Sequence, residues 1–114
     1  MTRMADLAPP TRGSHATPPA EDWVPSPTSP GWFLRTLLET PGHSTQLMRV
    51  EPGTLSPPHA HDRIEQIYIL DGSLYDDDGT VHPAGSFIVR APGAVHAGGS
   101  TDGATMLVVY GDVR

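Results

Sequence analysis

Four side chains that commonly bind transition metals define the best candidate for chemistry in this chain: His59, His61, Glu65 and His96. Imidazole nitrogens coordinate first-row metals at about 2.1 Å, and a carboxylate adds an oxygen ligand and negative charge. Alternate side chains of a strand share one face, so His59 and His61 are expected on the same side, about 7 Å apart along the backbone. Glu65 keeps that parity. We therefore predict one divalent metal site, in which Glu65 is either a ligand or a catalytic base.

Glycines frame these four residues at regular distances. Gly53 is followed by five residues, then His59, one residue, His61, three residues, Glu65, six residues and Gly72. A second group places two glycines before His96, namely Gly85 and Gly93. The two groups resemble the two motifs of the cupin superfamily. The second departs from the usual pattern at Ala91, where a proline is common, and at Ser100, where an asparagine is common.

The stretch from Glu65 through residues 83–86 to Tyr110 most resembles a group of small cupins. These are related to the C-terminal domain of the ChrR anti-sigma factor, and to dihydroxyacetophenone and acetylacetone dioxygenases. The resemblance implies an all-β fold, the cupin double-stranded β-helix or jelly-roll barrel. It also implies one divalent transition metal per chain, with Fe(II) favoured and Zn, Ni or Mn as alternatives.

Short apolar stretches broken by glycine, proline and aspartate supply the elements that would position these ligands. They predict seven strands, at residues 32–38, 45–50, 65–70, 73–75, 86–90, 95–99 and 105–110, and no long helix. Asp71-Gly72 and Asp78-Gly79 predict tight hairpin turns. Many short strands with such punctuation are typical of a sandwich or barrel.

The first 30 residues differ in composition from the rest. They hold seven of the thirteen prolines of the chain, which prevents them from forming a central strand. We predict a proline-rich arm over residues 1–30 and a cupin domain over residues 31–114. Trp23 and Val24 are expected to pack on the barrel or on a partner chain.

Strand parity gives the possible walls of a substrate pocket. Ile67 shares the parity of the predicted ligands, and the remaining candidates lie on facing strands, although each could equally belong to the core. The candidates are Trp32, Met48, Ile67, Phe87, Met106, Val108 and Tyr110. His43 and His82 lie outside both motifs and are expected to be exposed, and the run Asp76 to Asp78 is expected to form a solvated loop tip.

Composition excludes several classes of function. The chain has no cysteine, so a metal must be held by histidine and carboxylate. A net charge of -6 argues against nucleic acid as a partner. The chain contains no apolar run of membrane-spanning length and no signal-peptide pattern, so we expect no membrane partner and a cytoplasmic location. A homodimer built edge to edge is expected, because pairing would cover strand edges.

Three functions agree with these features. The first is an Fe(II) dioxygenase-like oxidoreductase acting on a small phenolic or diketone-type substrate. The second is a redox-neutral Zn, Ni or Mn cupin, such as an isomerase, cyclase or decarboxylase. The third is a non-enzymatic metal-binding sensor module, because one fold supports many functions.

Overall fold

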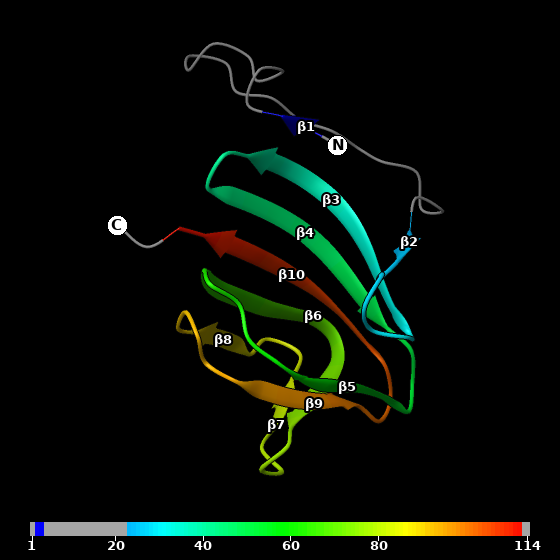
Figure 1. The fold of residues 1–114 in the computed structure, drawn as a ribbon. Coiled ribbons are helices and arrows are strands. Elements are labelled where there is room, and N and C mark those ends of the chain that lie inside the picture. The colour runs from blue at the N-terminus through cyan, green and yellow to red at the C-terminus, as the bar shows by residue number, and fades with distance from the viewer. Residues whose placement is uncertain (1, 4–22, 113–114) are drawn as a thin grey trace.

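The fold is built from strands alone in the part of the chain that the structure, a computed structural model, describes, residues 2–3 and 23–112 (Figure 1). This confirms the predicted all-β class, and no helix in these residues is long and apolar enough to cross a membrane. The strands are β1 (Thr2–Arg3), β2 (Val24–Pro25), β3 (Trp32–Thr40), β4 (His43–Val50), β5 (Thr54–His59), β6 (Ile64–Asp76), β7 (Val81–Pro83), β8 (Phe87–Arg90), β9 (His96–Ser100) and β10 (Ala104–Gly111).

The strands form one curled, mostly antiparallel sheet. Its main path runs β1-β3-β4-β10-β6-β9-β5, while β2 pairs with β3, and both β7 and β8 pair with β6. The sheet curls into two layers, and strand β6 belongs to both. Its residues 64–72 pair with β10 in one layer, and its residues 73–76 pair with β7 or β9 in the other. Figure 1 shows β3, β4, β10 and β6 following one another across the curved layer. This curl creates the space in which the predicted ligands meet.

Gly72 allows β6 to pass from one layer to the other. The hairpin predicted at Asp71-Gly72 is wrong, because β6 continues without a break from Ile64 to Asp76. Gly72 has a φ of +75°, and a Cβ at this position would collide with the carbonyl oxygen of Gly103. A left-handed glycine therefore bends the strand instead of reversing it. The Asp78-Gly79 turn does reverse the chain, between β6 and β7.

Strand β5 was missed in the sequence because it contains Pro57 and Pro58. Among the strands that the structure describes, it lies at the end of the sheet and pairs with β9 alone, with an irregular register between Ser56 and His59. Proline is tolerated at such an edge because its missing N–H leaves no interior ladder bond unmade. The strand ends on His59, a predicted metal ligand. The seven predicted strands therefore lacked the element that carries this histidine.

The core lies between the two layers. Its buried members are Val50, Ile67, Ile69, Leu74, Ile88, Ala104, Met106 and Val108, with Trp32, Met48 and Tyr110 packed against them. Ser100, which replaces the usual asparagine of the second motif, is fully buried and donates a 2.6 Å hydrogen bond to the Ser73 carbonyl. The departure from the motif is therefore accommodated by a bond between β9 and β6.

The residues just before Gly31 attach to the edge of the sheet. Val24 and Pro25 pair with Leu34 and Phe33 of β3, which agrees with the exclusion of a central strand. Arg35 lies 4.7 Å from the centroid of the Trp23 ring, a cation–π distance. Trp23 thus packs on the barrel, whereas Val24 is exposed. The domain boundary at residue 30 stays a prediction.

Candidate metal centre

Two of the three histidines are brought together by the pairing of β5 with β9. His59 ends β5, His96 begins β9, and the two residues are direct cross-strand partners. His61 lies just beyond β5 rather than within it, so strand parity does not position it. The Gly93 N–H instead donates a 2.7 Å hydrogen bond to the His61 carbonyl, and so ties the first motif to the second. One ring nitrogen of each histidine lies within 4.8 Å of those of the other two.

Hydrogen bonds to the backbone orient two of the rings. His59 Nδ1 lies 2.8 Å from the Pro57 carbonyl oxygen, and His96 Nδ1 lies 3.2 Å from the Ala94 carbonyl oxygen. A carbonyl can only accept, so Nδ1 is the donor in both rings, and in the neutral imidazole Nε2 then keeps its lone pair. Burial lowers the pKa of His96, which favours the neutral imidazole that metal binding requires. Both rings therefore present Nε2 as the ligand atom.

Glu65 lies beside this cluster and is almost fully buried, with 4% of its surface exposed. Its Oε2 lies 3.5 Å from His61 Nε2, and its Oε1 lies 3.6 Å from His96 Nε2. Cross-strand pairing places Tyr110 of β10 on one side and Arg90 of β8 on the other. The predicted four residues therefore come together, although the nitrogen cluster itself comprises the histidines alone. Whether Glu65 is a fourth ligand stays a prediction.

Unpaired polar atoms test whether a cation suits this place. His61 Nε2 and Glu65 Oε1 are both buried and have no hydrogen-bond partner among the described residues. A ring nitrogen and a carboxylate oxygen buried without a hydrogen-bond partner are costly, and a bound cation would satisfy both when the nitrogen presents its lone pair. Imidazole nitrogens with a carboxylate suit a divalent transition metal. The residues present therefore fit such an ion, and the three histidines could hold it.

Tyr110 fixes one oxygen of Glu65. Its hydroxyl donates a 2.7 Å hydrogen bond to Glu65 Oε2, and its ring centroid lies 5.0 Å from that of His61. Burial, together with the negative charge and hydrogen bond of Glu65, raises the pKa of the Tyr110 hydroxyl. The hydroxyl therefore stays protonated and serves as a donor. Oε1 accepts no hydrogen bond from the described residues, although Arg90 Nε lies 3.6 Å from it.

A chain of ion pairs leads away from Glu65, and sequence reasoning missed it. Arg90 Nε lies 3.6 Å from Glu65 Oε1, and Arg90 Nη2 donates a 2.9 Å hydrogen bond to Asp76. The other Asp76 oxygen lies 2.9 Å from His82 Nε2, which donates to it. Asp76 and His82 are thus half-buried and paired, not the exposed groups that were expected. Only the cross-strand register of β6 with β7 and β8 brings them together.

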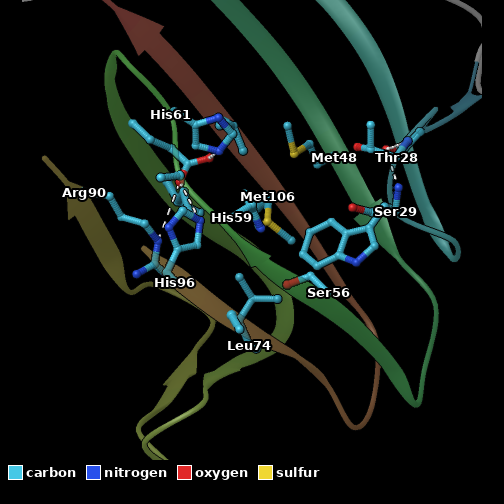
Figure 2. Close-up of a pocket in the computed structure, with 18 of the residues that line it drawn as sticks. Thr28, Ser29, Met48, Ser56, His59, His61, Leu74, Arg90, His96 and Met106 are labelled. Carbon is cyan, nitrogen blue, oxygen red and sulfur yellow. Dashed lines mark hydrogen bonds and ion pairs between the residues drawn. The ribbon is translucent and has the colours of Figure 1, made fainter. Parts of the chain in front are cut away.

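A cavity of about 570 Å³ opens beside the histidines (Figure 2). Six of the seven predicted wall residues line it: Trp32, Met48, Ile67, Met106, Val108 and Tyr110. Phe87 does not. It is 59% exposed on the outer face of β8, because the inward residue of that strand is its neighbour, the buried Ile88. The prediction therefore assigned the inward face of β8 to the wrong set of alternate residues.

The far side of the cavity was not foreseen. A turn at residues 26–29, which we assigned to the arm, lines this side (Figure 2), and Leu34, Ser56 and Leu74 also line the cavity. The Ser26 hydroxyl accepts hydrogen bonds from the backbone N–H groups of Thr28 and Ser29. The Ser-Pro-Thr-Ser composition of this segment was the one available signal, since such residues favour turns. It could not reveal that the turn faces a cavity.

A model of one protein family, described as the ChrR cupin-like domain, matches residues 12–114. The chain belongs to this family. The match confirms the cupin resemblance of the two motifs, and it covers the three histidines, Glu65 and the cavity. Among curated proteins, none matches this ChrR-like cupin significantly.

Solved structures agree with the family. An acetylacetone dioxygenase from Acinetobacter johnsonii has a TM-score of 0.77 at 16% identity, covering 86% of this chain and 73% of its own. An RmlC-like cupin from Shewanella frigidimarina has a TM-score of 0.72 at 18% identity, with coverages of 89% and 94%. The polyketide cyclase RemF from Streptomyces resistomycificus has a TM-score of 0.66 at 27% identity, with coverages of 80% and 72%. These likenesses confirm the cupin fold.

Proposed function

We propose that this cupin is an Fe(II)-dependent, dioxygenase-like oxidoreductase that acts on a phenolic or diketone-type substrate. The observation that carries the proposal is the three-histidine cluster at one end of a largely apolar cavity. The apolar lining suits an organic ligand, and the cavity leaves room for a substrate next to the metal ligands. The structural likeness to an acetylacetone dioxygenase supports this choice of chemistry.

The metal would supply Lewis acidity and redox chemistry towards an oxygen-chelating substrate. His59, His61 and His96 would hold it through nitrogen atoms, two of them already oriented by Pro57 and Ala94. Three neutral imidazoles leave the positive charge of the ion largely uncompensated, which favours an anionic enolate or phenolate.

Glu65 Oε1 is positioned to accept the proton that such a substrate loses on binding. This oxygen has no hydrogen-bond partner among the described residues, while Oε2 is held by Tyr110. The O–H bond of the enol or phenol would break and a bond from hydrogen to Oε1 would form. If Glu65 instead stays a ligand, its substitution will lower metal content as well as activity.

A redox-neutral reaction is the second candidate. It is supported by the likeness to the polyketide cyclase RemF, whose identity of 27% exceeds the 16% of the dioxygenase. The same three histidines could hold Zn, Ni or Mn, and Glu65 could act as the base of a cyclisation or isomerisation. A metal-binding module without turnover is the third candidate. A cytoplasmic location stays a prediction.

Metal analysis coupled to oxygen uptake separates these candidates. The chain is purified without chelator, loaded anaerobically with Fe(II), and mixed with acetylacetone, 2-hydroxyacetophenone or catechol in an oxygen electrode. About one metal per chain and substrate-dependent oxygen uptake, lost in His61→Ala and kept in His43→Ala, would support the dioxygenase. Oxygen-independent turnover with Zn or Ni would favour the redox-neutral enzyme, and binding without turnover would favour the module.

A further inference from the structure

The two faces of the β3–β4 pair carry different side chains. Leu34 and Met48 are cross-strand partners that line the cavity. Alternate residues of a strand point to opposite faces, so the neighbouring partners Phe33 and Arg49 lie on the outer face, and Arg35 shares that face. The guanidinium carbon of Arg49 lies 4.6 Å from the centroid of the Phe33 ring. The outer face therefore presents two guanidinium groups and an aromatic ring, away from the cavity.

Residues 23–31, which we term the strap, contact both faces of this pair of strands. The centroid of the Trp23 ring lies 4.7 Å from the guanidinium carbon of Arg35 and 5.5 Å from that of Arg49, on the outer face. Three residues further along the chain, the turn at residues 26–29 lines the cavity on the inner face (Figure 2). The strap thus passes around the edge of β3. A side chain outside the cavity is connected by a few residues to part of the cavity wall.

The two ends of the strap are held differently. At its end, the Gly31 carbonyl accepts a 2.9 Å hydrogen bond from the Glu51 N–H, which follows β4. At its start, β2 contributes two residues that pair with β3 alone among the described strands, and Val24 is 62% exposed. The Ser26 N–H adds one 2.8 Å bond to the Trp32 carbonyl. With so little pairing and burial, this start depends on the cation–π contacts of the tryptophan before β2.

The turn between these ends is braced from within. The Ser26 hydroxyl accepts hydrogen bonds of 3.3 Å and 3.2 Å from the backbone N–H groups of Thr28 and Ser29. A turn fixed by such bonds keeps its own shape. Its place in the cavity wall is therefore set by how the two ends of the strap are held.

We propose that Trp23 is a positioning residue of this cavity. By holding the start of the strap against Arg35 and Arg49, it keeps the turn at residues 26–29 in place as a wall. Release of the ring lets the turn swing about Gly31 and admits or releases a ligand. The inference goes beyond the proposed function, because it concerns entry to the cavity and applies to any metal or reaction there.

Thiol labelling tests the strap directly, because the chain has no cysteine of its own. Met48→Cys introduces a single thiol into the cavity lining, and the neutral reagent dithiodipyridine is added to the native chain. Trp23→Ala in this background should raise the labelling rate by about tenfold, the equilibrium change expected for loss of partly buried cation–π contacts. Trp23→Phe keeps a ring and should restore most of the protection.

A second thiol separates opening of the strap from a general loss of stability. Ile88 is buried in β8 and lies outside the cavity lining, so labelling of Ile88→Cys reports opening of the whole fold. Trp23→Ala should leave that rate unchanged. The proposal would be overturned by an unchanged rate for Met48→Cys, and equally by the same acceleration of both thiols.

Hydrogen exchange gives a readout that needs no introduced thiol. Trp23→Ala should speed exchange of the Ser26 N–H, whose bond to Trp32 breaks when the strap opens, by about tenfold, and leave the amides of β10 unchanged. Unchanged exchange at Ser26 would contradict the strap. Neither measurement depends on metal or turnover, so a failure of the oxygen-uptake test would contradict the proposed function and leave this inference in place.

Discussion

At the scale of single residues, the histidine cluster is defined by hydrogen bonds as well as by ligand type. Pro57 and Ala94 accept from the Nδ1 atoms of His59 and His96, so the rings are oriented before any ion arrives. Because the rings are already oriented, metal binding loses less side-chain conformational entropy. The sequence shows the ligand types, but these two carbonyl partners follow from the local backbone geometry.

Removal of one imidazole is expected to disable the centre. His59→Ala, His61→Ala and His96→Ala should each weaken Zn(II) or Co(II) affinity by more than about 100-fold, since even partners of ligands matter at the 10- to 100-fold level. Competition with a chromogenic chelator measures the change. The control is His43→Ala, an exposed histidine outside the cluster. An affinity equal to that of His43→Ala in any of the three would contradict the ligand assignment.

The ion-pair chain predicts an acid-dependent contribution to stability. Burial opposes ionisation of Asp76, but hydrogen bonds from His82 and Arg90 outweigh it and lower the pKa of Asp76 below its ordinary 3.8. A depressed carboxylate pKa stabilises the fold above the unfolded value, and that contribution is lost as pH falls through the folded value.

Asp76→Asn should therefore cost about 1 kcal/mol of unfolding free energy near pH 7, a value reduced for partial exposure. The difference from wild type should shrink below the ordinary pKa of 3.8. Urea unfolding of the metal-free chain at several pH values measures it, with the exposed Asp102→Asn as control. A difference that does not change with pH would contradict the paired carboxylate.

At the scale of elements, β6 organises both layers and the centre. Its first part carries Glu65 between Tyr110 and Arg90, and its last part carries Asp76. The bend at Gly72 makes this double role possible. The sequence predicts two strands here, at residues 65–70 and 73–75, because an Asp-Gly pair is a strong hairpin signal. The signal was outweighed because β6 is paired on both sides of the glycine, with β10 up to Gly72 and with β7 and β9 after it.

Substitution of Gly72 tests this bend. Gly72→Ala combines a positive φ with a collision against the Gly103 carbonyl, so it should cost about 3 kcal/mol or more. Gly79→Ala is the matched control, because Gly79 also has a positive φ but no atom within 4 Å of an added Cβ. It should cost about 1 kcal/mol. Equal losses in chemical unfolding would show that strain alone matters at both positions.

At the scale of the whole molecule, an apolar patch lies on the outer face of β6 and β8. Tyr68 and Phe87 are cross-strand partners that are 45% and 59% exposed, and Leu70 and Val89 beside them are also exposed. Contiguous exposed apolar groups mark interaction surfaces. Two copies of a chain with net charge -6 repel each other least through an uncharged face. We therefore propose that a homodimer forms face to face through this patch, rather than edge to edge as the sequence led us to expect.

Light scattering after size exclusion should give the mass of a dimer for the wild type and that of a monomer for Phe87→Asp. Buried carboxylates facing each other across a twofold axis would oppose association. Val81→Asp, on exposed β7, introduces the same charge outside the patch and should leave the dimer intact. A monomeric wild type at micromolar concentration would exclude this interface.

The side chains of the centre and the class of fold that holds them could be predicted from the residue types and their spacing. Ligand chemistry restricts a metal site to a few residue types, and the glycine spacings carry backbone requirements that are local, so both can be recognised without coordinates. The predicted His59, His61 and His96 consequently meet within 4.8 Å.

The surroundings of these histidines, in contrast, could not be predicted without the folded structure. The pairing of Arg90 with Asp76 and His82, the outward face of Phe87 and the turn that closes the cavity all depend on the register between strands distant in sequence. A one-residue change of register reverses every side chain of a strand, and nothing in the strand's own sequence fixes its partner. The ligands of the centre can thus be recognised from residue type and spacing, whereas the residues around them depend on how the strands of the sheet pair.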